Sequence, residues 1–355
     1  MRRSIVLLSV FVCLSFTSPS MLWADEKPGD IKKTTCGDIF SYVFGNYPST
    51  GSVTTDDIAE KKSKLNIPKN WEFNMEVKRY IASNTSYEFG EPEGNLTKPL
   101  SRLEFPINTW WLNFDLRRTC PRWSAGARAG FSMNRNSNGV MEDSDWTTSG
   151  GRNVLTNYSR SYCDIRKAFL FKGDVDVNIS DWLGLPPSME IRPLFAFQFQ
   201  RFNPVAHDGT QWNYDKGTVE DLAGNAISFR QDWYTYMIGM RGSYSFNLNK
   251  NVTVKLKTEA DWGPAIGHNE DHHILRGDRW TYEDTPGNAL YFLAGFDMVV
   301  SKTITIGAGV DYMWIKTFGT HRWRDPSVPV DRTWPDGVKV WSDQLGLTMH
   351  ASYAF

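Results

Sequence analysis

Residues 303–314 read TITIGAGVDYMW, and this stretch contains the pattern that decides the fold. Apolar side chains occupy every second position, and the positions between them are mostly polar residues or glycine. The apolar positions are Ile304, Ile306, Ala308, Val310, Tyr312 and Trp314. Successive side chains of a β-strand point to opposite faces, so this alternation predicts a strand with one fully apolar face. The last eleven residues, 345–355, repeat the pattern and end at Phe355.

Similar segments recur from about Trp71 onward, joined by two kinds of connection. The short ones are 117–121, 184–187, 247–251 and 301–302, and the longer polar ones lie near 83–100, 142–160, 205–225, 265–280 and 320–340. Five long and four short links imply ten strands. The pattern predicts an all-β fold, a ten-stranded antiparallel transmembrane β-barrel with long extracellular loops and short periplasmic turns.

A soluble β-sandwich would give the same alternation, because it also buries one face of each strand. Three features favour the membrane barrel: the signal peptide predicted at the N-terminus, the aromatic residues near strand ends and the terminal Phe355. The mean hydropathy of −0.44 does not exclude it, since lumen-facing polar residues keep the average low in such barrels.

The first 70 residues precede the barrel. Residues 1–24 carry two arginines, an apolar core and a small residue at Ala24, which predicts a signal peptide. We interpret residues 25–70 as a periplasmic extension and residues 71–355 as the barrel. Removing the signal takes two of the 39 basic residues and none of the 40 acidic ones, which leaves a net charge of about −3 and no indication of nucleic-acid binding.

Three cysteines remain after the signal is removed. They are Cys36 in the extension, Cys120 in the first short turn, and Cys163. An odd count permits one disulfide and one spare thiol. Because the extension and the first turn are expected on the same side of the membrane, a disulfide between Cys36 and Cys120 is a hypothesis.

Two short motifs could carry chemistry. Asp143 and Asp145 form a D-x-D pair, and Asp271 and His273 form a D-x-H pair. On a strand, residues i and i+2 share a face, so Asp271 could orient the His273 imidazole, and the opposing carboxylates could hold a water. Loop carboxylates are often merely solvated, and carboxylates with imidazole can also form a metal site. The spacing alone therefore leaves the function open.

The sequence resembles the omptin family of outer-membrane proteases. The resemblance rests on Gly139–Trp146, on Asp271–His273 followed by Arg279–Tyr282, and on weaker similarity in three strands, and it covers about residues 71–355. It implies that Asp271 and His273 are the catalytic dyad, with His273 as general base in preference to His272. It also implies that Asp143 and Asp145 position the water and support the tetrahedral intermediate, with no metal and no cofactor.

The resemblance also implies how substrate is bound. Omptins prefer bonds beside basic residues, and Glu88, Asn269 and Met141 are the expected substrate-binding positions. Asn269 departs from the acidic residue of the family, which weakens the expected contact with a cationic side chain. The implied partners are peptide or protein substrates, some of them cationic, together with outer-membrane lipid.

Lipopolysaccharide is the expected activator, because omptins require it. Arg201 occupies one expected lipopolysaccharide position, but Asp232 stands where a basic residue is expected. The implied location is the bacterial outer membrane, with the active site facing the cell exterior.

Two other functions remain open. The barrel could be a non-catalytic adhesin or receptor on the same fold, or a different hydrolase that uses a serine. Ser144 lies between the two aspartates and would point away from them on a strand, which makes it a poor nucleophile.

Overall fold

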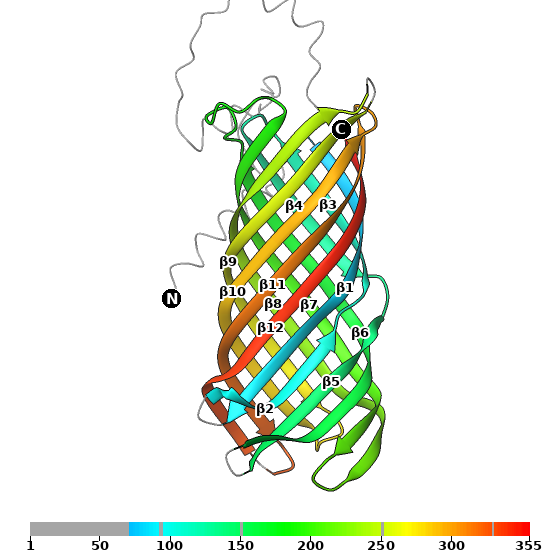
Figure 1. The fold of residues 1–355 in the computed structure, drawn as a ribbon, viewed down its shortest axis with the longest axis vertical. Helices are drawn as coiled ribbons and strands as arrows, with labels where there is room; N and C mark the ends of the chain where they lie inside the picture. Colours follow the sequence, from blue (N-terminus) through cyan, green and yellow to red (C-terminus); the bar gives the residue numbers. More distant parts are fainter. Residues whose placement is uncertain (1–70, 92–94, 150–151, 250–251, 329) are drawn as a thin grey trace, which may run out of the picture. The chain divides into compact units, whose positions relative to one another are not determined.

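The computed structural model describes residues 71–91, 95–149, 152–249, 252–328 and 330–355. All regular elements in these ranges are β-strands (Figure 1). They are β1 (Trp71–Glu91), β2 (Asn95–Pro106), β3 (Trp110–Thr119), β4 (Trp123–Ser132), β5 (Asn136–Ser149), β6 (Arg152–Val177), β7 (Met189–Asn213), β8 (Thr218–Asn247), β9 (Thr253–His273), β10 (Arg279–Val299), β11 (Ile304–Asp325) and β12 (Val330–Ala354). No helix in the described part of the chain is long and apolar enough to span a membrane.

The strands form one antiparallel sheet that closes on itself. Each strand from β6 to β12 pairs with the next along the chain, and β12 pairs with β1 to close the ring. The backbones of Trp71 and Phe355 hydrogen-bond to each other where the ring closes. A closed sheet has no free edge, which is what a β-barrel requires. The predicted all-β antiparallel barrel is confirmed at this level.

The described part of the chain forms twelve strands rather than the ten predicted, because two predicted strands are interrupted. β3 pairs with the first half of β1 and β2 with its second half, while β5 and β4 likewise share β6. Pro106 ends β2, since proline has no backbone N–H to donate to the ladder. The two halves therefore follow one another along a single neighbouring strand.

The predicted long loops are mostly strand in the structure. For example, residues 205–225 belong to β7 and β8 except for a turn at 214–217, and residues 265–280 belong to β9 and β10 except for 274–278. Sequence polarity was misleading here because both faces of these strand ends carry polar residues. The predicted short turns do lie between strands, at the end of the barrel where the chain terminates.

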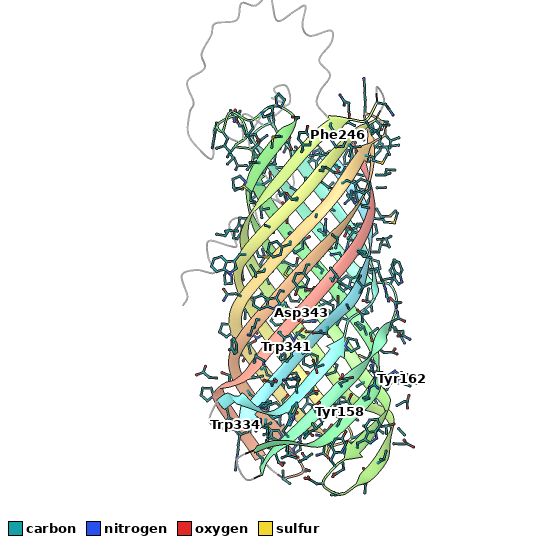
Figure 2. The ribbon with its side chains drawn as sticks, in the orientation of Figure 1. Tyr158, Tyr162, Phe246, Trp334, Trp341 and Asp343 are labelled. Atoms are coloured by element: carbon teal, nitrogen blue, oxygen red, sulfur yellow. The ribbon has the colours of Figure 1, made fainter. Side chains whose placement is uncertain are left out.

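The outer surface changes character along the barrel. Large apolar side chains are exposed over the part nearer Phe355; they include Ile238, Met240, Trp262, Phe292, Leu347 and Met349. Toward the other end the outward positions become charged, as at Arg230, His268 and Glu270. Figure 2 shows the two ends, with Phe246 at one and Trp334 and Tyr158 at the other. An exposed apolar band of this kind is typical of a barrel surrounded by lipid.

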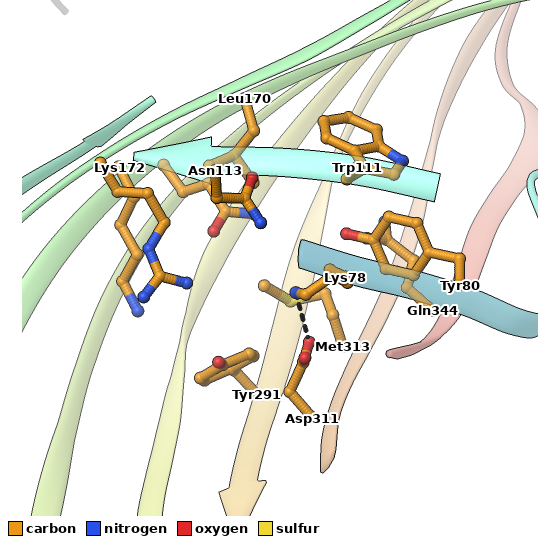
Figure 3. Close-up of a pocket in the computed structure, with 12 residues that line it drawn as sticks. Lys78, Tyr80, Trp111, Asn113, Leu170, Lys172, Tyr291, Asp311, Met313 and Gln344 are labelled. Carbon is orange, nitrogen blue, oxygen red and sulfur yellow. Dashed lines mark hydrogen bonds and ion pairs between the residues drawn. The ribbon is translucent and has the colours of Figure 1, made fainter. Parts of the chain in front are cut away.

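The barrel interior is filled by side chains. In its polar part, the Lys78 ammonium lies 2.8 Å from the Asp311 carboxylate (Figure 3), and Lys172 lies 2.9 Å from Glu259. Buried charges are normally paired in this way, because an isolated one loses its hydration without compensation. An apolar core that includes Tyr87, Phe105, Trp233 and Met141 occupies another part of the interior.

Several sequence predictions fall on residues 1–70, which lie outside the described residues. These are the signal peptide, the extension and Cys36. Cys163 is a free, buried thiol, and Cys120 is disulfide-bonded. The pairing of Cys36 with Cys120 stays a prediction.

Candidate active site

The D-x-H motif lies at the end of β9, beyond the apolar band. Asp271 and His273 both point into the barrel and are almost completely buried, whereas His272 points outward and stacks on Trp280. The Asp271 Oδ2 atom lies 2.8 Å from the His273 Nε2 atom. The carboxylate therefore holds the imidazole through Nε2, as the spacing predicts, and leaves Nδ1 as the second ring nitrogen.

Tyr87 on β1 completes this arrangement. Its hydroxyl donates a hydrogen bond to Asp271 Oδ2, and its ring stacks on Phe229 with centroids 5.6 Å apart. Phe229 pairs with Asp271 across β8 and β9. Asp271 thus accepts hydrogen bonds from a phenol and an imidazole in apolar surroundings, which fixes its orientation.

The D-x-D motif lies on β5 and faces the same interior. Asp143 pairs with Leu103 and Asp145 with Ser101, which are inward-facing residues of β2. Arg276, in the turn after β9, lies 3.4 Å from the Asp143 carboxylate and 3.3 Å from that of Asp145. The turn that follows His273 therefore reaches the aspartate pair, so the two motifs belong to one site.

Burial controls the protonation of these groups. Burial and, next to it, the neighbouring Asp145 carboxylate raise the pKa of Asp143 from 3.8 to about 7 against the opposing effect of Arg276. Burial lowers the pKa of His273 below its ordinary 6.5, although Asp271 acts in the other direction. Burial alone would raise the pKa of Asp271, but His273 and Tyr87 together bring it below its ordinary value. These shifts favour a neutral His273 imidazole at neutral pH, and Asp143 keeps its proton to a higher pH than an ordinary carboxyl.

Three buried atoms of the site have no hydrogen-bond partner among the described residues. They are Asp143 Oδ1, Asp271 Oδ1 and His273 Nδ1. Nearly all buried polar atoms in folded proteins are satisfied, and exceptions often mark places where a reactant is bound. No group of three or more metal-ligating side chains occurs within the described ranges.

A cavity of about 330 Å³, called the rim cleft here, opens beside the site. Asp145, Arg276 and Thr281 line it together with side chains of β11 and β12. Its wall also contains His321, whose Nδ1 atom lies 2.9 Å from the Glu283 carboxylate. The rim cleft is at the small end of the range for ligand pockets, which suits one substrate side chain.

The comparisons with known proteins are consistent with this geometry. The family model described as Omptin family matches residues 92–321, which is more than half of the chain. The chain belongs to the omptin family. The resemblance to this family that the sequence motifs indicate is confirmed.

Solved structures show how far the likeness extends. The crystal structure of the outer membrane protease OmpT from Escherichia coli matches with a TM-score of 0.71 and 15% identity, covering 81% of this omptin and 98% of that chain. The translocator domain of the autotransporter NalP from Neisseria meningitidis (TM-score 0.34, 6% identity, 84% and 93% covered) and OprG from Pseudomonas aeruginosa (0.35, 12%, 81% and 95%) also match. The first match shows a shared fold. A comparison with curated proteins found no match.

The structure brings together the four predicted catalytic residues of this omptin but separates the predicted substrate-binding ones. Glu88 lies on the opposite face of β1 from Tyr87 and pairs with Arg102 and with Lys339, the latter at 2.8 Å. Its substrate-binding role stays a prediction, and this outward placement does not support it.

Asn269 and Met141 do lie in the interior. Both side-chain polar atoms of the buried Asn269 lack a hydrogen-bond partner among the described residues, and Met141 belongs to the apolar core. Ser144 pairs with Arg102 on the outer side, away from Asp143, as expected.

Four residues in or beside the site could not be placed from the sequence. Tyr87 directly precedes Glu88, a predicted substrate-binding residue, but nothing in the sequence spacing places the Tyr87 side chain on the inner face of the barrel. Arg276 is in a turn whose conformation, with positive φ at Gly277 and Asp278, has no sequence signature strong enough to place its side chain. Glu283 and His321 lie 38 positions apart and meet only because β10 and β11 pair.

Proposed function

We propose that this omptin is an outer-membrane endopeptidase in which a water is activated between the Asp271–His273 dyad and the Asp143–Asp145 pair. The similar E. coli structure is that of an outer membrane protease, which supports this function. The observation that carries the proposal is the buried imidazole held through Nε2, with its Nδ1 without a partner among the described residues, in the same site as the Asp143–Asp145 pair, where the pKa of Asp143 is raised to about 7.

The proposed reaction needs no covalent intermediate. His273 Nδ1 takes one proton from the water as its oxygen bonds to the peptide carbonyl carbon. With Asp143 protonated, the aspartate pair can accept a hydrogen bond from the water and donate one to the developing oxyanion. When the C–N bond breaks, His273 passes its proton to the leaving nitrogen, and the new carboxylic acid releases its remaining proton to solvent.

Asp271 and Tyr87 act through His273. The carboxylate stabilises the imidazolium that forms during the reaction, and the phenol keeps the carboxylate in place. In this proposal the site faces the cell exterior, because it lies at the end of the barrel opposite the chain terminus and the short turns.

Cleavage beside basic residues and activation by lipopolysaccharide are parts of the family expectation that the experiment must test separately. The Glu88 charge is compensated by Arg102 and Lys339. Arg201 donates two hydrogen bonds to Asp232 on the outer surface, so its charge is also compensated. Activity with and without lipopolysaccharide would decide whether the lipid is required.

The test is peptide cleavage by the mature chain refolded in detergent. Quenched peptides, including an Arg-Arg peptide, are compared for the parent and for Asp143→Ala, Asp271→Ala and His273→Ala. We expect each variant to lose at least about a hundredfold in kcat, the usual effect of removing a general base or its partner. Glu142→Gln, on the outer face next to Asp143, is the matched control. If the parent cleaves no peptide in lipopolysaccharide, the alternative of a non-catalytic adhesin or receptor is favoured.

A further inference from the structure

The charge of the rim cleft differs from what a cationic side chain would need. Its charged lining consists of one carboxylate, Asp145, and three guanidinium groups, Arg276, Arg279 and Arg332. Asp145 is already paired with Arg276. Two positive charges therefore remain without a compensating carboxylate in the cleft wall.

Arg279 and Arg332 have no ion pair within 4.0 Å among the described residues. Arg279 instead lies over the ring of Trp323, 5.5 Å from its centroid, and Trp323 pairs with Arg332 across β11 and β12. Arg332 is exposed, whereas Arg279 is half-buried and its Nε atom is buried, so an anion placed beside Arg279 is bound more strongly than in water.

Two buried donors in this wall also lack an acceptor. They are Arg279 Nε and Trp323 Nε1, neither of which has a hydrogen-bond partner in the part of the chain that the structure describes. Unsatisfied donors and guanidinium groups without an ion-pair partner call for the same kind of ligand group, an oxygen acceptor that carries negative charge.

The aromatic walls of the rim cleft limit the kind of molecule that can carry this negatively charged acceptor group. Trp146, Trp323 and Trp334 line the cleft, and a stacked series continues from Trp323 through Trp334 and His321 to Phe89. The cavity of about 330 Å³ opens toward Asp145 and Arg276, which belong to the catalytic site. A short carboxylate side chain with an apolar stem fits this volume and lining.

We propose that the rim cleft selects an acidic side chain, aspartate or glutamate, of a peptide substrate, and that Arg279 and Arg332 bind its carboxylate next to the scissile bond. This inference rests on the proposed endopeptidase function and replaces the basic-residue preference of the family expectation. Arg279 and Arg332 are then specificity-determining residues.

The test uses three quenched peptides that are identical except for a central Glu, Gln or Arg in a neutral sequence. For the refolded parent we expect kcat/KM for the Glu peptide to exceed that for the Gln peptide by about tenfold or more, equivalent to about 1.4 kcal/mol. Arg279→Gln and Arg332→Gln should each remove most of this ratio. The matched control is Arg322→Gln, whose side chain points outward from β11 and pairs with Asp331, and it should keep the ratio.

A binding measurement separates the two hypotheses. His273→Ala is titrated with the Glu and Gln peptides, and the fluorescence of the cleft tryptophans reports occupancy. Tighter binding of the Glu peptide supports the inference even if no peptide is cleaved, in which case only the proposed function fails. Faster cleavage of the Arg peptide, equal binding of Glu and Gln peptides, or an unchanged ratio in both arginine variants would overturn the inference while leaving peptidase activity established.

Discussion

Replacing Asp143 with asparagine should stabilise the barrel at alkaline pH while removing its activity. Burial and the neighbouring Asp145 carboxylate raise the pKa of this carboxyl from 3.8 to about 7, so the folded state binds its proton more tightly than the unfolded state does. Stability must then fall as the pH rises through that interval, since the folded protein is the form that holds the extra proton. Each pH unit corresponds to about 1.4 kcal/mol, which makes the ionised carboxyl cost up to about 4 kcal/mol above pH 8. Asparagine has a similar shape and does not ionise.

The assay is urea unfolding of the refolded barrel, followed by tryptophan fluorescence at pH 5 and pH 9. Near pH 5 the unfolded chain has already ionised this carboxyl while the folded parent keeps its proton, so the variant should be more stable than the parent by about 1.6 kcal/mol. At pH 9 the Asp143→Asn variant should be the more stable by up to about 4 kcal/mol. Glu142→Gln, the outward-facing neighbour, should stay within about 0.5 kcal/mol of the parent at both values. A variant that is less stable than the parent at pH 9, or a difference independent of pH, would refute the reasoning.

Three further predictions concern activity. The pH profile of kcat should be bell-shaped. It should rise below pH 6.5 as His273 loses its proton and fall near pH 7 as Asp143 ionises, and measuring kcat in buffers between pH 4 and 9 would test this. In Arg276→Gln the alkaline flank of that profile should move to higher pH, because Arg276 lowers the pKa of Asp143; an unmoved flank would count against the contact. Tyr87→Phe should lower kcat by about tenfold or more with little change in KM, the effect of losing one hydrogen bond to a charged group, and an unchanged kcat would show that the phenol does not position Asp271.

The face of a residue could be predicted from the sequence where the alternation is uninterrupted. On β9 the i, i+2 rule places Asp271 and His273 inside and His272 outside, and the structure agrees. The same rule works for Asp143 and Asp145 on β5. The all-β barrel follows from the same alternation. Contacts between strands far apart in the sequence, such as that of Tyr87 with Asp271, depend on the register in which the strands pair. The alternation of side chains along one strand gives no information about that register.

β1 shows why the rest could not be predicted. Between Ile81 and Asn84 its register with β12 shifts by one residue, and Ala82 adopts a φ of 47°. One inserted residue moves every later side chain of the strand to the opposite face. A bulge leaves little trace in the sequence, since alanine is not a residue that favours positive φ. Counting along β1 therefore fails to show which of Tyr87 and Glu88 points inward.

That bulge also connects the fold to the choice of substrate. It turns Tyr87 toward Asp271 and Glu88 toward Arg102 and Lys339, so β1 contributes a neutral phenol to the interior and its carboxylate to an outer ion cluster. With Asn269 as the neighbouring interior position, neither of the two expected acidic contacts reaches a substrate from inside. The charges of the rim cleft that have no ion-pair partner among the described residues are those of Arg279 and Arg332. Guanidinium groups in a cleft wall discriminate against cationic side chains by repulsion as well as in favour of anionic ones by attraction.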